Sequence, residues 1–151
     1  MENTNEMELI FDACSKNESF ARVTAAAFLT QLNPTLEEVA DVKTAVSEAV
    51  TNCIIHGYEG TQGKIHMKCT IEDNVFEVTI SDDGCGIPDV RKAMEPMYTT
   101  KAELERSGMG FSFMEAFMDT LSVESKEGRG TVVTMRKIVN RGRKEWTTQS
   151  L

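Results

Sequence analysis

The chain has 151 residues, of which 40% are hydrophobic and 26% charged, and its formal net charge is −8. This length is sufficient for one domain with a hydrophobic core. The acidity argues against direct binding to nucleic acid, because phosphate contacts need an excess of basic residues. No run of eighteen apolar residues occurs and the N-terminus lacks the pattern of a signal peptide, so we expect no contact with a membrane.

The four cysteines are widely spaced, and no two of them form a C-x-x-C pair. Because the chain has only two histidines, we do not expect a zinc site. Free thiols are typical of a protein that is kept reduced, which favours a cytoplasmic location.

The first two elements are predicted to be a strand and a helix. Residues 7–13 (MELIFDA) are compatible with an edge strand. Residues 17–32 are predicted to form a helix that ends at Asn33-Pro34. Its apolar residues recur at steps of three and four, and those expected to face the core are Phe20, Val23, Ala27 and Phe28, with Leu32 further on.

A second helix is predicted from Pro34 to Gly57. Proline and threonine are typical of a helix start, and glycine is typical of a helix end. The residues expected to form its core stripe are Leu36, Val39, Val42, Val46, Ala49, Val50 and Cys53.

The rest of the chain predicts two β-hairpins separated by a long loop and a helix. Residues 63–82 alternate apolar and polar side chains on either side of a turn at 72–74. A loop-rich region, 83–110, precedes a short helix, and the second hairpin turns at 127–130 and ends at Ile138. This order predicts an α+β fold, a two-layer α/β sandwich in which helices cover one face of a mostly antiparallel sheet. We expect one domain over residues 1–138 and a polar, disordered tail over 139–151.

Three polar residues follow one line along the second predicted helix. Glu48, Asn52 and His56 are four residues apart, so they share a helical face. An exposed polar stripe is the simplest explanation, but an asparagine inside a helix is unfavourable and needs another reason. The spacing therefore favours a functional site on this face.

The stretch SDDGCGIPD, residues 81–89, places an Asp-x-Gly-x-Gly pattern at the end of a predicted strand. Gly84 and Gly86 permit a sharp turn and a close approach of the backbone to a ligand. Asp82 is then positioned to accept a hydrogen bond. On its own the pattern is also compatible with an acidic turn.

The long loop contains a second glycine-rich stretch. Thr99, Lys101 and Arg106 are followed by Ser107-Gly108-Met109-Gly110, immediately before a predicted helix. Such a stretch can offer backbone N–H groups and basic side chains to phosphates, and long loops in compact domains tend to be lids or binding loops. Gly130-Thr131, at the start of the last strand, predicts by itself only a turn.

In this order the motifs resemble the GHKL ATP-binding family, which includes gyrase-type ATPases, Hsp90, histidine kinases and MutL. The resemblance covers residues 17–137. The segments SFARVTAAAFLTQL, VSEAVTNCIIHGYEG and TTKAELERSGMGFSFMEAFMD are further similar to the anti-sigma factor serine kinases, most of all to the anti-sigma-F factors of sporulation. The resemblance implies the Bergerat α/β sandwich, which agrees with the predicted element order.

The resemblance also implies roles for single residues toward ATP and Mg²⁺. Asn52 is the implied Mg²⁺ ligand, and Glu48 is the implied catalytic base for a substrate hydroxyl. Asp82 is expected to accept a hydrogen bond from the adenine amino group. The other implied ATP contacts are Gly84, Gly86 and Thr131 at the base and Thr99, Lys101, Arg106, Ser107, Gly108, Met109 and Gly110 in the lid. For His56, an orienting role near the phosphates and a structural role at the helix end both stay open.

Two linked activities are implied by the resemblance. One is the sequestration of an RNA polymerase sigma factor, with sigma-F expected. The other is the phosphorylation, with Mg-ATP, of a serine on an anti-anti-sigma protein, which inactivates that antagonist. Arg22 lies in a segment that resembles the family's partner-binding region, although a solvated helix charge explains it equally well. The family forms homodimers, and the strand MELIF is a candidate for the pairing.

Other functions stay open at this point. General-stress (sigma-B-type) anti-sigma kinases share these motifs. A histidine kinase module needs a phosphoacceptor histidine on a dimerising helix, and neither His56 nor His66 lies in such a setting. A pure ATPase module would act on further domains, none of which is visible in this sequence. A sequestering protein whose ATP site only shapes the fold is opposed by the presence of Glu48. The motifs of eukaryotic-type kinases and P-loop proteins do not occur.

Overall fold

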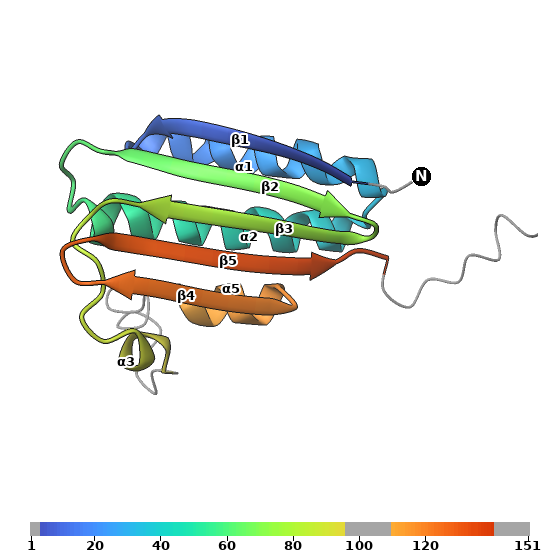
Figure 1. Ribbon diagram of the computed structural model, residues 1–151. Coiled ribbons are helices and arrows are strands. Elements are labelled where there is room, and N and C mark those ends of the chain that lie inside the picture. The colour runs from blue at the N-terminus through green and yellow to red at the C-terminus, as the bar shows by residue number, and fades with distance from the viewer. Residues whose placement is uncertain (1–3, 96–109, 141–151) are drawn as a thin grey trace, which may run out of the picture.

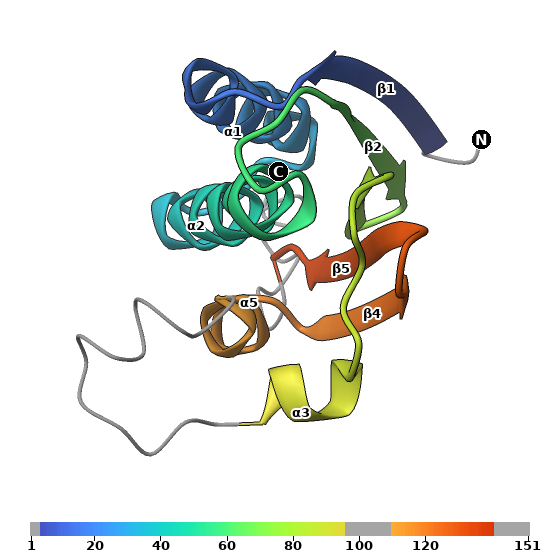
Figure 2. The ribbon, with the colours of Figure 1, turned by 90° about the vertical axis from the view of Figure 1, so that its left-hand side faces the viewer.

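The computed structural model describes residues 4–95 and 110–140, which form a sheet with helices on one of its faces (Figures 1 and 2). The elements in chain order are β1 (Thr4–Asp12), α1 (Ser15–Leu29), the 3₁₀ turn η1 (Thr30–Leu32), α2 (Leu36–Asn52), the π-helical turn η2 (Cys53–Gly57), β2 (Lys64–Glu72), β3 (Val75–Asp82), α3 (Val90–Met94), α5 (Phe111–Phe117), β4 (Thr120–Lys126) and β5 (Gly130–Ile138). The predicted α+β sandwich is confirmed.

The five strands lie in the order β1-β2-β3-β5-β4, and each pairs with its neighbours in antiparallel fashion. β1 is an edge strand, as predicted, and both predicted hairpins form. The pairing of β3 with β5 joins segments that are distant in the sequence and sets Asp82 opposite Thr131. This non-sequential pairing brings together two residues that the motif analysis had selected separately.

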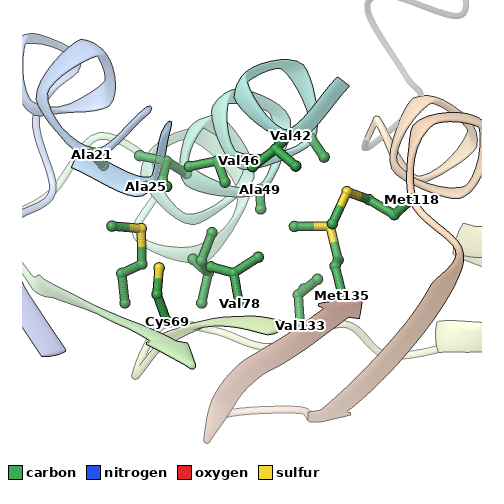
Figure 3. Packing of buried hydrophobic residues seen from close by; sticks show 14 of the residues in the cluster. Ala21, Ala25, Val42, Val46, Ala49, Cys69, Val78, Met118, Val133 and Met135 are labelled. Atoms are coloured by element: carbon green, nitrogen blue, oxygen red, sulfur yellow. The ribbon is translucent and has the colours of Figure 1, made fainter. Parts of the chain in front are cut away.

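The hydrophobic core lies between the helices and the inward face of the sheet. Alternate strand residues point inward, which is the pattern expected for a sheet with one covered face. Figure 3 shows the contact directly, with Val42 and Val46 of α2 above Val78 and Met135 of the sheet. All four of these side chains are fully buried.

The predicted core face of the first helix was wrong for Phe20, Val23 and Ala27, whereas Leu32, in η1, is buried. Phe20 and Val23 are 52% and 56% exposed, Ala27 is exposed, and Phe28 is only partly buried. The residues that pack inward are instead Ala21, Ala25, Ala26 and Leu29. Small side chains on the buried face allow α1 to approach its neighbours closely, so the larger apolar residues are left outside.

The predicted start of α2 is confirmed by a capping box. The Glu38 amide donates to the Thr35 hydroxyl over 3.0 Å, and the Thr35 amide donates to the Glu38 carboxylate over 2.8 Å. The predicted core residues from Val42 to Cys53 are buried, but Leu36 is 90% exposed. Leu36 is the first residue of the helix, and the Cα–Cβ bonds of a helix tilt toward its N-terminus.

The long loop and the C-terminal end of the predicted domain differ in detail from the prediction. The described part of the loop region contains a short helix that was not predicted, α3, and residues 96–109 of the loop lie outside the described part. Val139 is fully buried and Asn140 donates to Leu32 and Glu38, so packing extends at least two residues into the segment predicted as tail. Within the described ranges, no helix combines the length and the apolar character needed to cross a membrane.

Candidate functional site

A pocket opens where α2, η2, β3, β5 and the start of α5 meet. Several of the residues selected from the sequence line it together: Asn52, His56, Asp82, Gly86 and Thr131. They come from segments that are separated by long stretches of chain. The fold therefore gathers the helix motif, the Asp-x-Gly-x-Gly motif and the last-strand motif around one space.

Asp82 provides a buried acceptor in the cavity wall. It is the last residue of β3 and only 6% exposed. Its carboxylate accepts a hydrogen bond from the Gly84 amide over 2.9 Å. Burial raises the pKa of Asp82, while the Gly84 hydrogen bond opposes that shift. A carboxylate buried in this way is a strong acceptor for a donor group on a ligand.

Cys53 also lines the cavity, in contact with Asp82. Its thiol makes a hydrogen bond with the carboxylate, and burial followed by the negative charge of Asp82 raises the pKa of the thiol well above its usual range. From the sequence, Cys53 was predicted only as part of the core stripe of α2. No local signal identified it as a neighbour of Asp82, because the contact depends on how α2 and β3 pack.

Glycines stand at the points where backbone segments cross near Asp82. A Cβ on Gly57 would lie 2.9 Å from the Asp82 carboxylate, and one on Gly84 would lie 2.1 Å from the Gly57 carbonyl oxygen. Gly86 has a φ of +75° and its Cβ would meet the Lys126 carbonyl oxygen at 2.1 Å. Gly84 itself does not line the cavity; its amide instead holds Asp82.

Thr131 lies next to Asp82 across the β3–β5 pairing, and its hydroxyl is held by Ser125. The two hydroxyl oxygens are 2.8 Å apart, and the Ser125 hydroxyl accepts the Ile87 amide over 2.7 Å. Thr131 is 9% exposed. These hydrogen bonds join β4, β5 and the loop after β3, so they fix this wall.

The helix that carries Asn52 does not run regularly to Gly57 as predicted. α2 ends at Asn52, and the next five residues form the π-helical turn η2, in which the Tyr58 amide donates to the Cys53 carbonyl over 2.9 Å. The wider turn changes the phase of the helix after Asn52. Asn52 and His56 both line the cavity. Such turns are frequent at functional sites.

Glu48 lies beside the cavity and not in its lining. It borders a second cleft, between α1 and α2, together with Arg22, Lys43 and Ser47. Its carboxylate lies against the backbone of Gly110, because a Cβ there would be 2.3 Å from Oε2. Burial, followed by the charge of Glu18, raises the pKa of Glu48. A carboxylate with a raised pKa is a better proton acceptor at neutral pH.

Arg22 lies in this same cleft. Its Nη2 donates to the Ser19 hydroxyl over 3.3 Å, and its buried Nε has no hydrogen-bond partner among the described residues. The predicted partner-binding residue is therefore close to the predicted base. The six remaining lid residues, Thr99, Lys101, Arg106, Ser107, Gly108 and Met109, lie outside the described part of the chain.

The apolar part of the cavity was not predicted as part of a site. Its walls include Ala49, Ile87, Phe111 and Val133. Ile87 and Phe111 directly follow the two glycine-rich motifs, which is the only signal that the sequence offered for them. Apolar walls with a few fixed polar groups are typical of a small-molecule site.

In the parts of the chain that the structure describes, no group of three or more His, Cys, Asp or Glu side chains is arranged to hold a metal ion. Asn52 offers a single neutral carbonyl oxygen at the edge of the cavity. This donor fits a Mg²⁺ ion that takes most of its ligands from phosphates and water. It does not form a complete protein cage for a metal.

Comparison with known proteins gives one family match and many relatives. The family described as "Histidine kinase-like ATPase domain" matches residues 14–137. The chain is 58% identical over 139 residues to an anti-sigma F factor of Thermoanaerobacter sp. (strain X514), covering 92% of this chain and 97% of the relative. It is 53% identical over 140 residues to the anti-sigma F factor of Bacillus subtilis (strain 168), covering 92% and 96%.

Solved structures agree on the fold. The RsbU and RsbW domains of Rv1364c from Mycobacterium tuberculosis match with a TM-score of 0.65 at 19% identity, covering 89% of this chain and 32% of that one. The blue-light activated histidine kinase of Erythrobacter litoralis EL346 matches with a TM-score of 0.58 at 17% identity, covering 80% and 41%.

Proposed function

Because the chain belongs to the histidine kinase-like ATPase domain family and, within it, to the anti-sigma F factors, we propose that it is an ATP-dependent serine kinase that also sequesters a sigma factor. The observation that carries the proposal is the convergence of Asp82 and Asn52 on one cavity with a glycine-lined backbone. A buried acid and a neutral amide oxygen are the two polar groups that adenine and magnesium phosphate would need there.

In this proposal, Asp82 selects adenine over guanine. Its carboxylate accepts a hydrogen bond from the exocyclic amino group of adenine. Guanine carries a carbonyl oxygen at the equivalent position, so two acceptors would face each other without a proton between them. The buried position of Asp82 increases the penalty for that mismatch. Gly86 and Thr131 bound the space beside the base, and the Gly84 amide holds the carboxylate in place.

Asn52 and Glu48 act on the phosphate side. The Asn52 side-chain oxygen would hold Mg²⁺, which when bound neutralises phosphate charge. Glu48 accepts the proton of the incoming serine hydroxyl, and its raised pKa suits this task. The two residues are four positions apart on α2, which is about 6 Å along the helix axis. Lys101, Arg106, Thr99 and the run Ser107–Gly110 complete the phosphate contacts as a lid.

The partners are a sigma factor, with sigma-F the first candidate, and an anti-anti-sigma protein as substrate. Arg22 borders the cleft that also contains Glu48, which supports entry of a partner's serine along α1. The phosphate adds close to two negative charges, and a chain with a net charge of −8 would repel the phosphorylated product. We further propose a cytoplasmic homodimer in which the exposed edge of β1 pairs between copies.

The decisive experiment incubates the protein with γ-labelled ATP, Mg²⁺ and the candidate antagonist, and then locates the label. Label on a serine of the antagonist is the expected result. Label on a histidine of this chain would support a histidine kinase module, and free phosphate alone would support a pure ATPase. Repeating sigma binding with sigma-F and with a general-stress sigma factor separates the two anti-sigma alternatives.

Glu48→Gln tests whether Glu48 is the catalytic base. The change keeps size and shape but removes the proton acceptor, so ATP binding and sigma binding are expected to persist while label transfer falls by at least about a hundredfold. ATP affinity is measured by calorimetry and transfer by the same labelling assay. If the variant transfers phosphate as fast as the wild type, Glu48 is not the base. If the wild type also transfers no phosphate, the result favours a protein that only sequesters the sigma factor.

A further inference from the structure

Two charged residues lie among the inward-facing strand residues that the structure describes. One is Asp82, at the cavity end of the sheet. The other is Lys137 on β5, which follows Thr131, Val133 and Met135 on the same face and pairs with Phe76 at the far end of β3. Strand alternation predicts an apolar residue at position 137. A lysine there needs an explanation that the nucleotide site does not provide.

The ammonium group of Lys137 joins three elements. It donates to the Asp41 carboxylate of α2 over 3.0 Å and to the Phe117 carbonyl oxygen, at the end of α5, over 2.6 Å. The side chains of Lys137 and Asp41 are only 13% and 20% exposed. A buried ion pair is weak evidence for a gain in stability, because desolvation offsets much of the attraction. Its geometry is more informative, because the two bonds hold α5 to α2.

α5 needs such an anchor. It has seven residues, which is about two turns, and helices of this length are marginal without tertiary contacts. No side chain caps its start at Gly110. At the end of the helix, the last carbonyl groups have no N–H donor within the helix. Lys137 donates a hydrogen bond to one of them, the Phe117 carbonyl oxygen. The backbone bonds that tie the following chain to β5 begin two residues later, at Asp119.

The other end of α5 reaches the nucleotide site. Phe111 is 3% exposed and lines the cavity, while Gly110 lies against the Glu48 carboxylate. Figure 2 shows α5 beside α2 on the covered face of the sheet, and Figure 3 shows Met118, just after α5, directed toward Met135 of β5. Because the helix is about 9 Å long from Phe111 to Phe117, a shift at one end moves the other.

The geometry points to Lys137 as a positioning residue for the nucleotide site. By holding the end of α5 against α2, it sets the place of Phe111 in the cavity wall and of Gly110 beside Glu48. Lys137 lies outside the cavity lining and takes no part in the chemistry. The effect on nucleotide rests on the function proposed above, whereas the anchoring of α5 does not.

The test compares two double variants. Lys137→Met with Asp41→Asn removes the anchor without leaving an unpaired charge. Glu6→Gln with Lys68→Met removes an exposed ion pair on the outer face of the sheet and serves as the control. Hydrogen exchange of the nucleotide-free proteins is followed by mass spectrometry. In the anchor variant, the amides of α5 should exchange at least about tenfold faster while those of β2 and β3 do not change, and the control should match the wild type.

Calorimetry then gives ATP affinity for the same proteins, and the anchor variant should bind at least about tenfold more weakly. If the amides of α5 exchange at the wild-type rate, or if exchange is equally faster throughout the sheet, the proposal that Lys137 anchors α5 is wrong. Faster exchange in α5 with unaltered ATP binding would overturn its link to the site. Failure of the wild type to bind ATP would instead contradict the proposed function, and the exchange data would still decide the anchoring.

If the double variant does not fold, the single variant Asp41→Asn replaces it in the same exchange experiment. This change keeps the hydrogen bond from Lys137 to Phe117. A smaller acceleration confined to α5 is then expected. No acceleration in α5 would overturn the proposal.

Discussion

In the described part of the chain, the hydrogen-bond partners of the Asp82 carboxylate are all neutral. They are the Gly84 and Thr131 amides and the Cys53 thiol. Because burial raises the pKa of Asp82, the folded protein favours the protonated form more than the unfolded chain does. The stability linked to this group is therefore present below the unfolded pKa, near 3.9, and is lost as the pH rises through the folded pKa.

Asp82→Asn should consequently raise the melting temperature of the nucleotide-free protein at pH 7. The neutral amide keeps an oxygen for the Gly84 bond and removes the buried charge. Thermal unfolding followed by circular dichroism at pH 7 and at about pH 4 provides the test, and the difference should shrink at the lower pH. A variant that melts below the wild type at pH 7 would show that the charge is stabilised by the fold.

The same change should damage nucleotide binding. A hydrogen bond to a charged group contributes about 1.5–3 kcal/mol, so ATP affinity should fall by roughly tenfold to a hundredfold. Preference for ATP over GTP should weaken as well, because asparagine offers a donor in addition to an acceptor. Calorimetric titration with both nucleotides measures this, and unchanged values for both would show that Asp82 does not contact the base.

At the scale of single elements, the start of α5 depends on Gly110. Its φ is +69° and its missing Cβ leaves room for the Glu48 carboxylate. Gly110→Ala should therefore displace Glu48 and reduce phosphate transfer by at least about tenfold, in addition to a backbone cost of about 1–2 kcal/mol. Transfer is measured under ATP saturation, so that weaker binding does not disguise the effect.

Gly128→Ala is the matched control for this change. Gly128 has a similar φ of +81°, but nothing lies within 4 Å of the position its Cβ would take. It should show the backbone cost and normal transfer. Equal activity in the two variants would indicate that Gly110 does not constrain Glu48, the proposed base.

The capping box of α2 gives a prediction that concerns stability alone. Thr35 lies at the opposite end of α2 from the cavity, and Thr35→Ala removes the hydroxyl that accepts the Glu38 amide. The free energy of unfolding in urea should fall by about 1 kcal/mol. ATP affinity should not change, and a loss of affinity would mean that the helix start is coupled to the site.

Some elements could be predicted from the sequence and others could not, for physical reasons. The strands were predictable because inward residues such as Ile65, Met67 and Val78 alternate strictly with polar ones. The face of α1 was not, because three of its four buried side chains are alanines, whose size gives little periodic signal. The π-helical turn after Asn52 was also missed, because no residue pattern distinguishes it from a regular helix end.

At the scale of the whole molecule, the site depends on contacts that no local pattern encodes. The motifs indicated Asn52, Asp82 and Thr131 one by one, and the resemblance to a known family joined them. Their meeting requires β3 to pair with β5, a strand almost fifty residues later, and α2 to lie across both. Phe111, Val133 and Cys53 became visible as neighbours of the site only through that packing.

Nucleotide should also stabilise the whole fold, because it binds the folded chain only. At a concentration about a hundred times its dissociation constant, ATP with Mg²⁺ should add about 2.7 kcal/mol to the free energy of unfolding. Thermal scans with increasing ATP measure this gain. At the same ATP concentration, Asp82→Asn should show a much smaller shift, whereas Thr35→Ala should show the full one.

The most direct test of the central claim is a crystal structure of the protein with Mg²⁺ and a non-hydrolysable ATP analogue. The account predicts the adenine amino group within hydrogen-bond distance of the Asp82 carboxylate and Mg²⁺ bound to the Asn52 side-chain oxygen, with Glu48 facing the terminal phosphate. Nucleotide bound at another place on the molecule, or this cavity left empty at saturating analogue, would contradict it.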